Sequence, residues 1–263
     1  MSIVGSTKIN MNKGRVLLHL ILLIYVGSSM VAFCFASNYA TYINNMDYKN
    51  KNKNINILHD NFTIHIGRLD RESNNGFFIL VDNLPWIVLG IYIVFQINNL
   101  LQNKLNLVPY ACFVEGTSMF INSVLHCITI LPDANMYSKA CYDPKKSTFG
   151  MWIFMPSLEY CGDMMWSGHT QHVILAMVLI YKIFNDRKYL NNNIKRAIFV
   201  AIIVCIIIFE MIFLVVFRLH YSIDTIISAL VNGLLYTHPL TNKILHSIES
   251  HFARYQEIVS TLV

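Results

Sequence analysis

Long, almost uninterrupted apolar stretches constrain this sequence more than any other feature. Crossing the hydrocarbon core of a bilayer takes roughly 20 apolar helical residues, because each backbone amide must find its hydrogen-bond partner within its own segment. Apolar residues make up 55% of the chain and charged residues only 13%, unlike an ordinary soluble domain. The stretches lie near residues 16–35, 84–101, 108–131, 166–184, 197–217 and 221–236. We expect an all-α polytopic membrane protein, a single domain over residues 1–263 built as a bundle of six transmembrane helices.

The distribution of basic residues indicates how these helices are oriented. The connection that follows the fourth stretch has the strongest cluster of basic residues near helix ends, and such short connections tend to stay in the cytosol. Its basic residues are Lys182, Arg187, Lys188, Lys195 and Arg196. The net charge of +5 suits basic cytosolic loops, and the sequence has no basic stripe interleaved with aromatic residues that would predict nucleic-acid binding. We therefore expect a membrane protein that does not bind nucleic acid.

Two connections on the opposite side of the membrane carry further expectations. Residues 37–76 form a polar segment whose centre, NNMDYKNKNKNIN at positions 44–56, has few large apolar side chains. Such a segment cannot bury enough surface to offset the entropy lost on ordering, so we expect a flexible loop. Cys141 and Cys161 share the loop between the third and fourth stretches, and an oxidising lumen would permit a disulfide between them. The sequence leaves that pairing open.

Two short polar motifs begin the fourth and sixth stretches. The fourth begins with CGDMMWSGHT at positions 161–170, which ends in His169 and Thr170. The sixth begins with HYSID, which runs from His220 through Tyr221 to Asp224. Because the fifth helix returns the chain across the bilayer, the starts of the fourth and sixth helices share one membrane face. His169 and His220 are therefore expected to meet there.

Two histidines and one aspartate are sufficient for phosphoryl transfer. His220 and Asp224 are four residues apart, so on a helix they share one face. The carboxylate can hold one imidazole nitrogen, which fixes the tautomer and leaves the other nitrogen as a nucleophile for phosphorus. His169 can give a proton to the departing alkoxide and later take one from an incoming hydroxyl.

Groups beside these histidines are candidates for binding the phosphate oxygens. Arg218 lies two residues before His220, and a guanidinium can contact a phosphate in bidentate fashion. The backbone amides at the start of the fourth helix, those of Ser167 and Gly168 among them, can donate at its positive end. Gly168 permits a close approach, and we expect Tyr221 to support the same site.

Each motif taken alone has an ordinary structural explanation. A Ser-Gly-His-Thr sequence is typical of a helix N-cap, and a histidine four residues from an aspartate often forms a plain polar contact. Ionisable groups within a bilayer are rare and usually functional, so the occurrence of both motifs at one face favours catalysis. His172, one turn from His169, offers a metal site with His220 and Asp224 as an alternative.

Three more ionisable residues, Glu115, His126 and Glu210, lie within the apolar stretches. An unpaired charge at the centre of a bilayer costs at least ~2.5 kcal/mol, so each is expected to face the interior of the bundle. There they either recognise a cationic head group or pair with one another, and a structural role is favoured for each.

The two motifs resemble the signatures of the sphingomyelin synthase family, C-G-D-x3-S-G-H-T and H-Y-[ST]-x-D-[VIL]. The first signature is matched in full, and the second is matched except at Thr225, where the family has an aliphatic residue. The resemblance implies that His169, His220 and Asp224 form the catalytic triad and that Asp163 supports His169. It also implies chemistry that needs no metal or other cofactor.

The resemblance implies the substrates as well. The family takes phosphocholine or a related head group from phosphatidylcholine or another glycerophospholipid, releases diacylglycerol, and passes the head group to the primary hydroxyl of ceramide through a phosphohistidine. Such enzymes lie in the Golgi or the plasma membrane with the active site on the lumenal or exoplasmic face. Arginines that the family carries near the third helix are Pro109, Tyr110 and Asn122 here, so the head group is open among choline, ethanolamine and inositol.

Two other functions stay open at this point. A lipid phosphate phosphatase or a phospholipase C-like hydrolase, from enzymes related to the same family, would use the same histidines but pass the phosphoryl group to water. A catalytically silent membrane scaffold or transporter would keep the histidines for packing alone. Loss of lipid turnover on removal of His220 would exclude the second of these.

Overall fold

The structure is a computed structural model, and it describes residues 13–50, 69, 73–101, 107–129, 166–217 and 219–261. All regular secondary structure in these residues is α-helical. The helices are α1 (Lys13–Asn50), α3 (Asn75–Leu101), α4 (Leu107–Ile128), α6 (Gly168–Asp186), α7 (Asn193–Val216), α8 (Ser222–Thr237) and α9 (Pro239–Thr261). The prediction of an all-α polytopic membrane protein is confirmed.

Four of these helices are long and apolar enough to cross a membrane. The apolar segments are Val16–Ala40 in α1, Asn75–Val94 in α3, and the whole of α4 and α7, while α8 is a shorter apolar helix. On α7, the exposed side chains of Ile194, Ile198 and Ile202 recur every four residues and so form one outward apolar face. Such a face is suited to contact with lipid rather than water.

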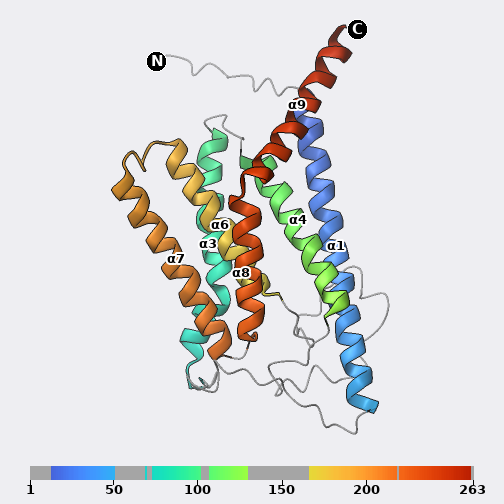
Figure 1. The fold of residues 1–263 in the computed structure, drawn as a ribbon, viewed down its shortest axis with the longest axis vertical. Helices are drawn as coiled ribbons and strands as arrows, with labels where there is room; N and C mark the ends of the chain where they lie inside the picture. Colours follow the sequence, from blue (N-terminus) through green and yellow to red (C-terminus); the bar gives the residue numbers. More distant parts are fainter. Residues whose placement is uncertain are drawn as a thin grey trace, which may run out of the picture.

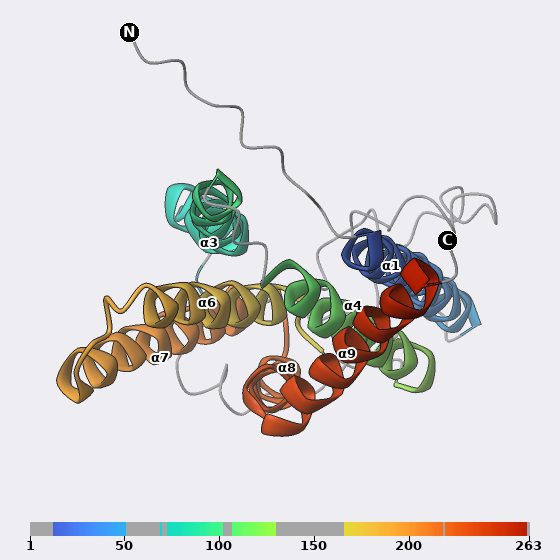
Figure 2. The same cartoon turned by 90° about the horizontal axis from the view of Figure 1, so that it is seen from above.

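Helix α6 lies at the centre of the bundle and is not among the four helices that are long and apolar enough to cross a membrane. It packs against α3, α4, α7 and α8, and α3 and α8 lie on opposite flanks of it (Figure 2). Its residues Val173, Ala176 and Leu179 are fully buried. Because neighbouring helices surround α6, its polar side chains find partners in the protein. The count of six crossings stays a prediction.

Helices α1, α4 and α9 form a second group beside α3, α6, α7 and α8 (Figure 1). Helix α1 packs along α4, and α9 crosses over both at one end of the bundle (Figures 1 and 2). The α1 side chains Ser29, Ala36 and Ser37 are small and buried, which lets neighbouring helices approach closely. The main hydrophobic core is built from buried residues of α3, α4, α6, α8 and α9, most of them on α6.

The observed helix bounds correct two predictions. Helix α1 continues to Asn50, well beyond residue 35, so the first part of the loop expected over 37–76 is helical instead; residues 51–68 and 70–72 lie outside the described residues. Helix α3 begins at Asn75 rather than near 84 and keeps Pro85 inside it. The reason is packing: Val81 and Phe77, before the proline, contact the end of α7. The possible disulfide between Cys141 and Cys161 also lies outside the described residues.

Candidate active site

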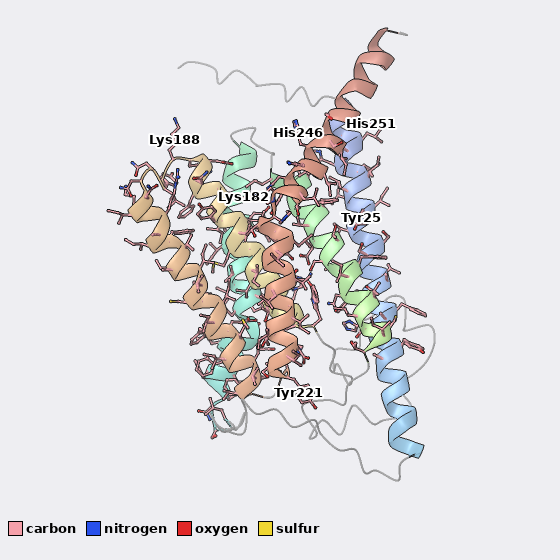
Figure 3. The ribbon with its side chains drawn as sticks, viewed as in Figure 1. Tyr25, Lys182, Lys188, Tyr221, His246 and His251 are labelled. Atoms are coloured by element: carbon pink, nitrogen blue, oxygen red, sulfur yellow. The ribbon has the colours of Figure 1, made fainter. Side chains whose placement is uncertain are left out.

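The starts of α6 and α8 lie close together at one end of the bundle. Ser167 caps α6, because its hydroxyl oxygen accepts a hydrogen bond from the Thr170 amide at 3.3 Å. The Ser228 hydroxyl of α8 donates to the Ser167 carbonyl at 2.7 Å and so ties the two helices together at this end. Tyr221 lies at this end of the bundle, where α8 begins, whereas Lys182 and Lys188 lie at the opposite end (Figure 3).

This arrangement brings the two motif histidines together. The ring centroids of His169 and His220 are 6.0 Å apart, and the rings meet edge to face. The two residues come from opposite sides of α7 in the sequence, so their proximity depends on the return of the chain across the bundle. The return of the chain through α7 predicts the same proximity.

His220 is paired with a carboxylate of its own helix turn. Its Nδ1 lies 3.7 Å from Oδ2 of Asp224, which leaves Nε2 as the nitrogen for chemistry. The same carboxylate oxygen accepts the backbone N–H of Tyr221 at 2.9 Å, and the Asp224 side chain is fully buried. The start of α8 therefore fixes Asp224, whose carboxylate lies within ion-pair distance of a protonated His220.

His169 is paired with a carboxylate from another helix. Its Nε2 lies 3.2 Å from Oδ1 of Asp82 in α3, which the sequence reasoning had not included in the site. The exposed fractions of the His169 and Asp82 side chains are 26% and 43%, so a substrate can reach both. Asp82 follows the apolar residues 77–81, which the predicted stretch of 84–101 left out, and a carboxylate inside that longer apolar run was the feature that could have identified it.

A second polar layer lies one helical turn from His169. His172 Nε2 is 3.1 Å from Glu115 Oε1, and its Nδ1 is 2.7 Å from the Gly168 carbonyl. Gln171 donates to the same Glu115 oxygen at 2.9 Å, and the Trp86 ring stacks on His172 with a centroid distance of 6.3 Å. Both ring nitrogens of His172 therefore lie beside an oxygen atom in this layer, one from Glu115 and one from the Gly168 carbonyl.

The other intramembrane polar residues have partners that suit a structural role. The Thr170 hydroxyl donates to Oε2 of Glu210 at 3.1 Å, and Glu210 is fully buried between α6 and α7. His126 is buried as well, with Nδ1 2.9 Å from the Asn122 carbonyl and its ring against Phe33. These contacts fit the structural role that was favoured for both.

Gly168 stands beside open space rather than beside another helix. A Cβ at this position would meet no atom of the described structure within 4 Å, so the glycine leaves room in front of the helix start. Asp163 and Arg218, which the sequence placed in the site, lie outside the described residues. Within the described ranges, no group of three or more His, Cys, Asp and Glu side chains is arranged to hold a metal ion.

The described site is thus a pair of carboxylate-paired histidines at one end of a helical membrane protein. Residues 160–240 match the family described as PAP2 superfamily C-terminal, whose members are phosphatases and phosphotransferases. The matched segment contains both motifs and the helices α6, α7 and α8. No curated protein and no solved structure matches the chain. The similarity thus covers the segment that carries His169, His220 and Asp224.

Proposed function

We propose that this protein is a membrane phosphotransferase that moves phosphocholine, or a related phosphorylated head group, from a glycerophospholipid to ceramide. The observation that carries the proposal is the pair of histidines with ring centroids 6.0 Å apart, each beside its own aspartate. One histidine can form a covalent bond to phosphorus while the other moves the proton. The similarity of residues 160–240 to lipid phosphatases and phosphotransferases supports the same chemistry.

In the first half of the reaction, Nε2 of His220 attacks the phosphorus of the donor lipid. The new P–N bond forms as the P–O bond to diacylglycerol breaks, and protonated His169 gives its proton to the departing oxygen. Asp224 stabilises the positive charge that develops on the His220 ring. The products of this half are diacylglycerol and a phosphohistidine.

In the second half, the primary hydroxyl of ceramide attacks the phosphorus of the phosphohistidine. Neutral His169 takes the hydroxyl proton as the P–O bond to ceramide forms and the P–N bond breaks. His220 is regenerated with its lone pair, and His169 is again protonated for the next cycle. The resemblance adds Arg218 and Asp163 as residues that support this site, Arg218 by contact with the phosphate oxygens.

The proposal includes an orientation in the membrane. Lys182 and Lys188 lie at the end of the bundle opposite Tyr221 (Figure 3), and basic connections favour the cytosol. The histidine pair would then face the lumen or the exterior, in the Golgi or the plasma membrane. Open space in front of Gly168 gives a phosphorylated head group room at that face.

The proposal is tested with purified protein in detergent, phosphatidylcholine labelled in the head group, and ceramide present or absent. We expect a labelled ceramide product that needs ceramide, and a loss of turnover by at least about 10²-fold in His169→Ala and His220→Ala. His246→Ala, in α9 at the opposite end of the bundle, is the matched control and should retain activity (Figure 3).

The alternative with a supporting observation is a hydrolase, because the matched family includes phosphatases. Release of free phosphocholine at the same rate with and without ceramide would select the hydrolase. Full activity of His220→Ala would remove the phosphohistidine mechanism altogether. Phosphatidylethanolamine and phosphatidylinositol, tested in parallel as donors, identify the head group.

A further inference from the structure

Helices α3 and α6 meet through two successive contacts between side chains. Asp82 and Trp86 are four residues apart on α3, and His169 and His172 are three apart on α6, so each pair occupies one helix face. Asp82 contacts His169 at 3.2 Å, and Trp86 stacks on His172 one turn further along. The two contacts fix the register of α3 against α6 at the level of the candidate site.

The contact between Asp82 and His169 parallels the pair on the other side of the site. Asp224 lies beside His220, Asp82 lies beside His169, and the two imidazole rings meet edge to face. The two aspartates differ in burial: Asp224 is fully buried, whereas 43% of the Asp82 side chain is exposed. The two pairs therefore offer two different environments, one closed and one open to the substrate side.

We propose that Asp82 is the positioning residue of His169, and that it holds the ring and stabilises its protonated form for general acid–base catalysis. The inference rests on the proposed function, because it assigns a helper to the proton-transferring histidine of that mechanism. Asp82 does not touch the reacting atoms; it acts through His169.

The two ring nitrogens of His169 have different roles: Nε2 bonds to Asp82, and Nδ1 transfers the proton. When the ring is protonated, Nε2–H donates to Oδ1 of Asp82, and Nδ1–H is the proton given to the departing diacylglycerol oxygen. When ceramide attacks, its hydroxyl proton returns to Nδ1 while Nε2–H stays on Asp82. The carboxylate thus keeps one tautomer of His169 throughout the cycle, and no other reactant is needed for the proton balance.

Other charged groups face His169 from the elements around it. His220 and Asp224 approach from the start of α8, and His172 lies one turn along α6. The remaining carboxylates, Glu115 of α4 and Glu210 of α7, bond to His172 and Thr170 in the next layer. Among the described carboxylates, Asp82 is therefore the one in contact with the His169 ring.

The test compares Asp82→Asn and Asp82→Glu with wild type in the labelled transfer assay across pH. Asp82→Asn keeps the size and an acceptor for Nε2–H but removes the charge. We expect kcat to fall by roughly 10- to 100-fold, as for other residues that orient a catalytic group, with KM little changed. Since the neutral amide no longer favours the imidazolium, the alkaline limb of the kcat profile should move to lower pH. Asp82→Glu should recover part of the activity.

Two controls separate this role from packing. Asn83→Ala changes the neighbouring residue, whose side chain bonds to the Ile79 carbonyl of its own helix, and should behave as wild type. Trp86→Phe disturbs the second α3–α6 contact without changing charge and should leave the alkaline limb in place. All variants are compared at equal folded amounts after size-exclusion chromatography.

The outcomes distinguish this proposal from the proposed function. Wild-type kcat and pH profile in Asp82→Asn, or a fall in kcat without movement of the alkaline limb, would overturn the positioning role and leave the histidine mechanism untouched. If Asp82→Asn does not fold, Asp82→Ser takes its place as the uncharged variant, and an unchanged alkaline limb in Asp82→Ser overturns the role in the same way. Full activity in His169→Ala would instead refute the proposed function itself.

Discussion

Replacement of Asp224 separates the electrostatic role of this residue from its role in the fold. The carboxylate of Asp224 lies 3.7 Å from His220 Nδ1 and accepts the Tyr221 amide at 2.9 Å. Asp224→Asn retains an oxygen that can accept the amide hydrogen bond, but it removes the charge. Asp224→Ala removes both. The two variants should therefore differ in stability and agree in their loss of activity.

The size of the effect on activity follows from the distance. Two unit charges 3.7 Å apart attract by about 4.5 kcal/mol if the effective dielectric constant is about 20. Since each 1.36 kcal/mol corresponds to about a tenfold change in rate, loss of the charge should lower turnover by roughly 10³-fold. The loss of the helix cap in Asp224→Ala should cost about 1 kcal/mol of folding stability in addition.

The assay is transfer of labelled head group to ceramide by each purified variant, with the thermal midpoint measured on the same samples. We expect Asp224→Asn to unfold near the wild-type temperature and to lose nearly all turnover. Turnover within tenfold of wild type in well-folded Asp224→Asn would refute the reasoning, because the buried charge would then contribute little to the chemistry.

Two further substitutions test the structural roles assigned above. Glu210→Gln can still accept the Thr170 hydroxyl and should keep both activity and thermal midpoint, whereas Glu210→Ala should lose about 1–3 kcal/mol of stability. A loss of turnover in Glu210→Gln as large as in the histidine variants would contradict a structural role. Gly116→Ala would place a Cβ 2.6 Å from Cε1 of Tyr25, so we expect about 1–3 kcal/mol of destabilisation from overpacking between α1 and α4. An unchanged thermal midpoint in that variant would show that the Tyr25 ring moves aside freely.

The helical class and the meeting of the two histidines were predictable from the sequence. Apolar stretches of membrane-spanning length specify helices, because a bilayer leaves the backbone no other partners. The proximity of His169 and His220 followed from topology alone, since α7 must return the chain to the same end of the bundle. Both inferences use only distances along the chain and the thickness of the membrane.

The partner of His169 was not predictable in the same way. Asp82 lies 87 residues away in the sequence, and its contact depends on which face of α3 packs against α6. The predicted second stretch also began near residue 84, one residue before Pro85, and a proline inside a helix removes one backbone hydrogen bond. In the structure, apolar residues before Pro85 pack against α7 and keep the helix continuous, so tertiary packing overrides the local preference.

Tertiary packing also explains why α1 continues beyond its predicted end near residue 35. Residues 37–50 are polar enough to predict a loop, but the buried Ser37, Asn38 and Ala40 show that the helix remains packed beyond the expected end. The composition of a segment indicates how much apolar surface it can bury, but it does not indicate which neighbouring helix supplies a surface to pack against.

The measurement that tests the central claim most directly is detection of the covalent intermediate. The protein is mixed with a donor lipid labelled at the head-group phosphate, quenched under alkaline conditions, and digested for mass spectrometry. We predict His220 with the whole phosphorylated head group bound to its Nε2, absent from His220→Ala and transferred to ceramide when ceramide is added. Active protein that carries label on no histidine, or on a residue other than His220, would contradict the mechanism.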